Sequence, residues 1–151
     1  IAFILVGLLM SLLFKTLKLL IISLVPNVFP LIVAGGIMGF SGMAFNASTA
    51  IVFTIGFVIA VDDTIHFLSK FKIECENTVD FKDAIWNTIN ETGKAIIITT
   101  IILFFGFLVL LHSDLKGVFS QGVLICSMLI AALFGDLCIM PILLKKFIGN
   151  R

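Results

Sequence analysis

Two adjacent carboxylates and a histidine lie within the apolar stretch VIAVDDTIHFL, residues 58–68. An ionisable side chain inside a membrane span costs about 2.5–3.5 kcal/mol on insertion scales, and it usually faces a bundle interior or a water-filled path. Neighbouring carboxylates also raise each other's proton affinity, because like charges repel at short range. Asp62 and Asp63 are therefore suited to binding and releasing a proton near neutral pH. His66 belongs either to this site or to the membrane interface, since it lies only four residues before Lys70.

Polar residues in three other apolar stretches lie at a similar depth, when depth is counted from the lysine at the end of each stretch. Asp63 is seven residues from Lys70, and the corresponding separations in the other stretches are six to nine residues. At about 1.5 Å per residue, these positions lie roughly 9 to 14 Å from one membrane boundary. The residues that share this predicted layer with Asp63 are Asn27, Thr100 and Asp136.

Each of these polar residues also has a purely structural explanation. Thr99 and Thr100 could bond to carbonyl groups of their own helix. Asn27 is flanked by prolines and could satisfy the carbonyls that they leave free. Asp136 could anchor its span by pairing with a backbone group. We therefore treat Asn27, Asp136 and His66 as auxiliary to the aspartate pair.

The placement of such side chains requires helices that cross a membrane. The chain has 151 residues, of which 60% are hydrophobic and 13% are charged, and it has 16 Phe and no Tyr. This composition is typical of an integral membrane protein and not of a soluble domain. The net charge of +1 leaves no basic surplus for phosphates, which argues against nucleic acid as a partner. The three cysteines show no ligand spacing, so we predict no metal site, disulfide framework or cofactor.

Five segments are apolar over a length that approaches or reaches the roughly 20 residues needed to cross a membrane as a helix. They cover residues 1–14, 19–40, 47–69, 95–112 and 118–144. The first is shorter than the others, and the chain opens within it, which suggests a span that has lost its beginning. The predicted fold is an all-α, polytopic transmembrane bundle that forms part of a longer protein.

The basic residues predict the orientation of these spans. Nine of the ten lie on one side of the membrane, and only Lys116 lies on the other. The positive-inside rule makes the side with nine basic residues cytoplasmic, and the C-terminus lies on this side. On the same side, residues 78–92 carry apolar and polar side chains at helical spacing, followed by Gly93. We expect a short amphipathic helix there, which lies along the cytoplasmic face and ends at Gly93.

Four stretches of the sequence resemble a known superfamily of membrane transporters. They are SLVPNVFPLIVAGGIMGF, AVDDTIHFLSKFK, TGKAIIITT and ALFGDLCIMPILL. Together they resemble the resistance-nodulation-division (RND) superfamily, in the branch of hydrophobe and lipid exporters related to the mycobacterial large membrane proteins (MMPL), hopanoid transporters and Patched. The resemblance covers essentially the whole chain, and VDDTIHFL is its most specific element.

The resemblance implies a place within a larger fold. Members of the superfamily have twelve spans in two repeats, and a large extracytoplasmic domain follows the first span of each repeat. This chain is similar to the last five spans, with the first of them truncated. The implied partners are the missing first repeat, the extracytoplasmic domains, membrane lipid and a hydrophobic or lipid substrate, while homo-oligomer formation stays open.

The resemblance also implies roles for individual residues. In this superfamily, acids of the fourth and tenth spans and nearby hydroxyls of the eleventh form a proton relay. Asp62 matches the first and more regular acid, and Asp63 matches the variable second one. A helical wheel instead favours Asp63 as the better buried of the two, so both remain candidates. Thr99 and Thr100 match the hydroxyls of the relay.

The sequence departs from the superfamily pattern just before the acids. Members usually read G-x-G-V-D-D, whereas this chain has Val58 and Ala60 where the glycines belong. Bulk at Val58 keeps a neighbouring helix further away. Gly56 could restore close packing, because it lies one turn before Ala60 on the same stripe of the helix.

We predict that the chain is the membrane part of a proton-driven secondary transporter in the inner membrane, not an enzyme, and that it exports lipids or other hydrophobic molecules. The first alternative is a sterol- or lipid-sensing membrane domain that does not pump. The second is an intramembrane aspartyl protease, in which Asp62 and Asp136 would share a proton. The sequence identifies neither the substrate nor the coupling ion, for which H⁺ is expected over Na⁺.

Overall fold

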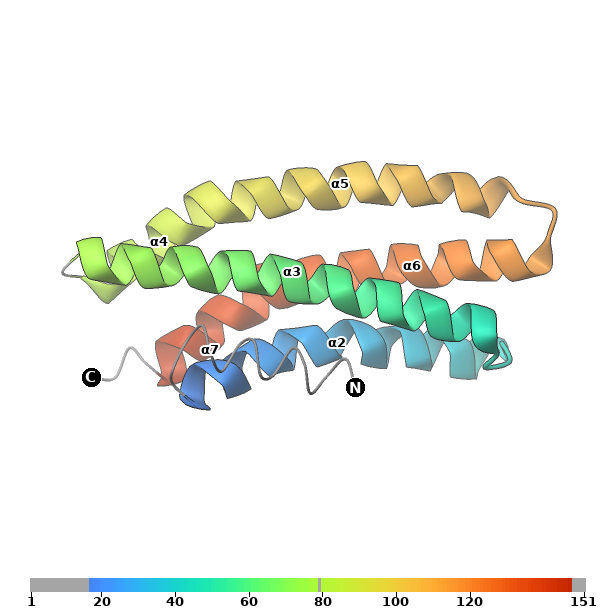
Figure 1. Cartoon of the computed structure of the whole chain (residues 1–151), viewed down its shortest axis with the longest axis horizontal. Helices are drawn as coiled ribbons and strands as arrows, with labels where there is room; N and C mark the ends of the chain where they lie inside the picture. The colour runs from blue at the N-terminus through green and yellow to red at the C-terminus, as the bar shows by residue number, and fades with distance from the viewer. Residues whose placement is uncertain (1–16, 79, 148–151) are drawn as a thin grey trace.

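The chain folds into long helices that run side by side (Figure 1). A computed structural model describes residues 17–78 and 80–147, and no strand occurs among them. The first half contains α2 (Leu17–Ser41), α3 (Ala47–Asn77), α4 (Phe81–Thr88) and the π-helical turn η1 (Ile89–Gly93). The second half contains α5 (Lys94–Leu108), the 3₁₀ turn η2 (Val109–His112), α6 (Lys116–Phe134), the π-helical turn η3 (Gly135–Ile139) and α7 (Met140–Phe147).

Four helical stretches are long and apolar enough to cross a membrane. They are Ile22–Ser41, Ala47–Asn77, Phe81–His112 and Lys116–Phe147. The prediction of an all-α, polytopic membrane bundle is therefore confirmed for the described part of the chain. The predicted span over residues 1–14 lies outside the described residues.

The expected amphipathic helix is not a separate element. Helix α4, η1 and α5 follow one another without a break, and Gly93 has the helical dihedrals φ −60° and ψ −39°. The prediction that Gly93 ends a helix is therefore wrong. A Cβ atom built on Gly93 would lie 3.2 Å from Leu137 Cδ2. This glycine allows the close approach of η3, and it does not reverse the chain.

The start of α3 is fixed by a reciprocal cap. The Asn46 Oδ1 atom accepts a hydrogen bond from the Thr49 amide at 3.0 Å, and Thr49 Oγ1 accepts one from the Asn46 amide at 2.9 Å. This capping box satisfies two backbone donors that the first helical turn leaves free. Just before it, Gly42 has a φ of +65°, which favours glycine and lets the chain turn back after α2.

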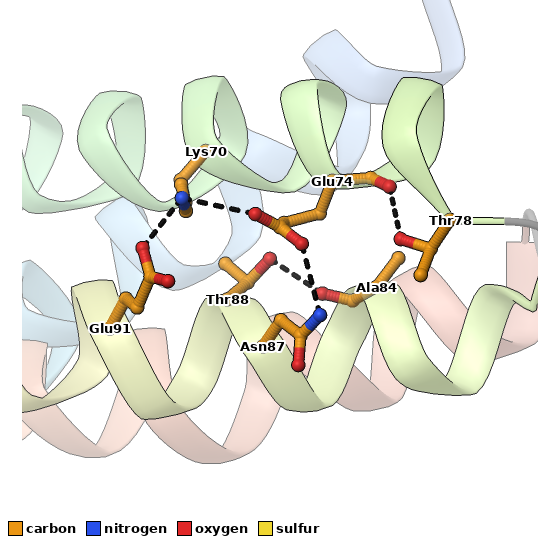
Figure 2. A network of polar contacts seen from close by, with 7 residues as sticks. All are labelled: Lys70, Glu74, Thr78, Ala84, Asn87, Thr88 and Glu91. Atoms are coloured by element: carbon orange, nitrogen blue, oxygen red, sulfur yellow. Dashed lines mark hydrogen bonds and ion pairs between the residues drawn. The ribbon is translucent and has the colours of Figure 1, made fainter.

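The opposite end of α3 extends beyond the length that a membrane requires. The helix has 31 residues, which corresponds to about 46 Å, whereas the hydrocarbon core is about 30 Å thick. Polar contacts tie the extension to the next elements (Figure 2). Lys70 Nζ lies 3.0 Å from Glu74 Oε1 and 2.5 Å from Glu91 Oε2 in η1, and Asn87 Nδ2 of α4 donates to Glu74 Oε2 at 3.1 Å. We call this end of the bundle the lysine-rich end.

Two apolar clusters form the core, one toward each end of the bundle. At the lysine-rich end, the buried members are Ile22, Phe67, Leu68, Phe71, Ala84, Ile96, Met140 and Leu144. Toward the Gly42 turn, they are Ala34, Met38, Val52, Leu124, Ile125, Met128 and Leu129. Along α2, α3 and the α6–η3–α7 stretch, buried polar residues lie between the members of the two clusters: Ser23, Asn27, Thr64 and Asp136. The core therefore has a polar layer between two apolar ones.

Candidate functional site

A buried hydroxyl joins three helical elements within the polar layer. Thr64 Oγ1 of α3 lies 2.7 Å from Asp136 Oδ1 of η3 and 3.0 Å from Asn27 Oδ1 of α2. Asn27 Nδ2 in turn donates to the carbonyl oxygen of Ser23 at 2.8 Å. All three side chains have relative exposures of 1% or less. The predicted common depth of Asn27 and Asp136 therefore corresponds to a direct network, in which Thr64 connects them.

The backbone of α2 and η3 permits this close arrangement. Proline at position 30 has no N–H, so the carbonyl of Pro26 lacks its usual partner one turn later in the helix. This carbonyl faces η3, because a Cβ atom built on Gly135 would lie 3.1 Å from the Pro26 oxygen. A larger residue than glycine at position 135 would push α2 away from Asp136. The π-helical form of η3 adds a local change of register, which is frequent at functional sites.

Thr64 is a site residue that the depth argument did not identify. Its partners are 37 and 72 residues away in sequence, so local spacing gives no sign of them. A signal is present in the periodicity of α3, where buried residues recur every three or four positions. The buried stripe from Phe57 to Phe71 is otherwise apolar, and Thr64 is its single polar member. A lone polar residue on a buried stripe needs a hydrogen-bond partner, either in its own helix or on a neighbouring one.

The predicted relay residues lie mostly in a second place, a groove between α3 and α5. This groove has a volume of about 570 Å³, and its polar lining consists of Asp62, Asp63, His66 and Thr99. The Asp62 and His66 side chains are 72% and 71% exposed, and Asp62 Oδ1 lies 3.9 Å from His66 Nε2. The structure therefore brings His66 beside the pair. Among the described residues, neither Asp62 nor His66 is enclosed.

The two threonines of α5 differ in their surroundings. Thr99 lines the groove, and its hydroxyl lies within hydrogen-bond distance of two carbonyl oxygens of its own helix, 3.1 Å from Ala95 O and 3.0 Å from Ile96 O. The structural explanation of Thr99 thus holds in this conformation. Thr100 is buried and does not line the groove. A shared relay role for the two threonines stays a prediction.

Asp63 lies between the groove and the buried network. Its side chain is half-buried and lines the groove, and its sequence neighbour Thr64 contacts Asp136 in the buried network. The helical wheel placed Asp63 on the stripe of Gly56, Ala60 and Phe67, and all three of those residues are buried. Asp63 is therefore the better buried acid of the pair, in agreement with the helical wheel.

The departure from the superfamily pattern has a clear structural counterpart. Val58 is exposed and lines the groove, whereas Ala60 is buried. Close helix packing occurs instead at Gly56, where an added Cβ atom would lie 2.3 Å from Met128 Cε of α6. The bulk of Val58 thus faces the open groove, and the small-residue contact is made by Gly56.

Asp62 and Asp136, the two acids that an aspartyl protease would have to pair, occupy different environments. Asp62 lies in the open groove, whereas Asp136 is enclosed and bonded to Thr64. A dyad needs both acids to share one proton, and these two occupy different environments. Among the residues that the structure describes, no group of three or more His, Cys, Asp or Glu side chains could hold a metal ion.

Comparison with known proteins identifies one family. The model of the MMPL family matches residues 1–150, which is nearly the whole chain. Searches of curated proteins and of solved structures gave no match.

Proposed function

The chain belongs to the MMPL family, and from this premise we propose that it is the membrane part of a proton-driven exporter of lipids or other hydrophobic molecules. Membership of this family supports an RND-type membrane transporter. The coupling to protons and the class of substrate are the proposed parts. The observation that carries them is the exposure of Asp62 and its neighbours in the groove between α3 and α5.

An exposed carboxylate on an apolar membrane helix needs a partner. At the centre of a lipid bilayer such a group costs about 2.5–3.5 kcal/mol, and membrane proteins cover it with another helix or with water. Apart from its polar residues, the groove is lined by aliphatic side chains such as Val58 and Ile102, and no lysine or arginine of the described residues lines it. A helix from the first repeat, which carries the matching acid in the resembling transporters, would cover this face.

Protonation would change how such a helix packs against the groove. A proton on Asp62 or Asp63 removes a charge from an apolar surface and favours closer packing, and loss of the proton has the opposite effect. Helix α3 contacts α2, α6 and α4, so a shift of α3 would change its packing against all three helices. Rigid-body rearrangement of this kind would move the extracytoplasmic domains and release a substrate outward.

We expect transport by the full-length protein to depend on a proton gradient. The test uses liposomes that contain the purified protein and a fluorescent phospholipid analogue, with a pH gradient imposed across the membrane. Movement of the probe should start with the gradient and stop when a protonophore dissipates it. An equal rate without a gradient would favour the lipid-sensing alternative, and dependence on a sodium gradient would contradict proton coupling.

The proposed orientation places the lysine-rich end in the cytoplasm. The first variant carries Asp114→Cys, in the loop between η2 and α6, as its single cysteine. We expect a membrane-impermeant maleimide to label this cysteine in intact cells. In the matched variant that retains only Cys75, which is exposed at the lysine-rich end, labelling should require permeabilised membranes. The reverse pattern of labelling would overturn the assignment from the positive-inside rule.

A further inference from the structure

The hydrogen bonds of the buried network require more protons than Thr64 can supply. A threonine hydroxyl carries one hydrogen and can donate it to a single acceptor. Its oxygen nevertheless lies within hydrogen-bond distance of two acceptor atoms, Asp136 Oδ1 at 2.7 Å and Asn27 Oδ1 at 3.0 Å. One of these contacts therefore needs a hydrogen from another source.

Asn27 cannot provide that hydrogen. Its amide nitrogen donates to the Ser23 carbonyl at 2.8 Å. If the amide were turned round, its oxygen would face this carbonyl oxygen, and two acceptors would meet without a proton between them. The Ser23 carbonyl thus fixes Asn27 Oδ1 as the atom that faces Thr64.

A proton on Asp136 completes the network. Asp136 Oδ1 then donates to Thr64 Oγ1, and Thr64 donates to Asn27 Oδ1, so each contact has one hydrogen. With Asp136 ionised, one of the two contacts would lose its hydrogen, and a full charge would be buried. The other oxygen, Asp136 Oδ2, is buried without a hydrogen-bond partner among the described residues. A buried oxygen that accepts no hydrogen bond costs far less free energy on a neutral carboxylic acid than on a charged carboxylate.

Among the described residues, no basic side chain lies within ion-pair distance of Asp136 to replace the proton. None of the ion pairs among the described residues involves Asp136. Between Ile22 and Ser41, α2 carries no titratable side chain, and between Ala95 and Leu108 the same holds for α5. On α3, Asp63 is the sequence neighbour of Thr64, which contacts Asp136, and its negative charge would oppose a second one nearby.

We propose that Asp136 is a proton-binding site in the core of the bundle, separate from the Asp62 and Asp63 groove, whose proton closes the contacts between α2, α3 and η3. Loss of this proton leaves one hydroxyl hydrogen for two acceptors, so either α2 or η3 loses its bond to α3. Occupation of the site therefore controls how three helices pack. The proposal does not depend on transport, since the proton would be held whether or not the protein moves a substrate.

Infrared spectroscopy of the full-length protein tests the proton directly. A protonated carboxylic acid has a C=O stretching band above the amide I band, and an ionised carboxylate does not. We expect the wild type at neutral pH to show such a band, and Asp136→Asn to lose it. The fold should survive this change, because an asparagine amide can donate to Thr64 Oγ1 as the protonated acid does. The matched control, Asp114→Asn in an exposed loop, should keep the band.

A second variant keeps the proposal testable if Asp136→Asn does not fold. Thr64→Val retains the acid and removes its hydrogen-bond partner, so the band should move to a different frequency. A spectrum that is the same in wild type, Asp136→Asn and Thr64→Val would overturn the proposal. Replacement of potassium by sodium in the buffer should leave the band unchanged. Its loss in sodium would identify a cation site instead and would also overturn the assignment of a proton.

Discussion

Replacement of both acids of the groove, by Asp62→Asn together with Asp63→Asn, is expected to reduce proton-driven transport by the full-length protein to the level of liposomes without protein. Asparagine has nearly the shape of aspartate, but its side chain binds and releases no proton near neutral pH. The groove would then keep its uncharged state throughout, and the change of charge that repacks α3 against its neighbour would not occur. The measurement is gradient-driven movement of a fluorescent phospholipid analogue.

The double replacement should leave the fold intact, which separates a relay from a structural role. Asp62 is exposed and Asp63 is half-buried, and the hydrogen bonds that join Asn27, Thr64 and Asp136 involve neither of them. The variant should therefore insert and purify at the wild-type level, as should the control Asp114→Asn, which should also transport normally. Wild-type transport by the double variant would refute the relay. The single variants would decide which acid is the principal one, since resemblance favours Asp62 and the helical wheel favours Asp63.

Thr64→Val is expected to destabilise the bundle more than the loss of an ordinary interhelical hydrogen bond. Such bonds contribute about 0.6 kcal/mol on average in membrane proteins. Valine has the shape of threonine, but it leaves both Asp136 Oδ1 and Asn27 Oδ1 without their hydrogen-bond partner. Each buried polar group left unpaired costs about 1–3 kcal/mol. We therefore expect the free energy of unfolding of the full-length protein, measured in a denaturing detergent, to fall by about 2–4 kcal/mol.

Thr64→Ser is the matched control for this effect. Serine keeps the hydroxyl and loses one methyl group, so the network should persist and stability should fall by only about 1 kcal/mol. Equal losses in the valine and serine variants would show that packing of the methyl group matters and the hydroxyl does not. A valine variant as stable as the wild type would contradict the bridging role of Thr64.

The sequence was sufficient for the fold class and for part of the polar layer. Long apolar segments can satisfy their backbone in lipid only as helices, so the fold class followed from composition and length. Depth along the membrane normal could be counted from the lysine at the end of each helix. Asn27 and Asp136 lie at similar depths by this count, and the structure joins them in one network. Depth alone does not reveal rotation about a helix axis. For this reason Thr64, an ordinary membrane-helix residue, was not identified.

Two glycines show why the remaining features could not be predicted. Gly42 has a positive φ and turns the chain, whereas Gly93 is helical and allows η3 to approach. In sequence, both are simply glycines near the predicted end of an apolar or amphipathic segment. Whether a glycine permits a turn or a close contact between helices depends on its surroundings in the fold. For Gly93 the neighbouring residue is Leu137, which lies far along the chain. The same limit applies to Asp62, whose environment depends on what covers the groove.

The unusual length of α3 has a mechanical consequence. A continuous helix of 31 residues moves as a nearly rigid rod, and its extension is fastened to η1 through Lys70 and Glu91. Thr64 contacts the neighbouring helices partway along the rod, beside Asp62 and Asp63. A small tilt of the helix about this contact would move its two ends in opposite directions. Motion at the lysine-rich end would then accompany an opposite motion at the Asn46 end, on the far side of the membrane.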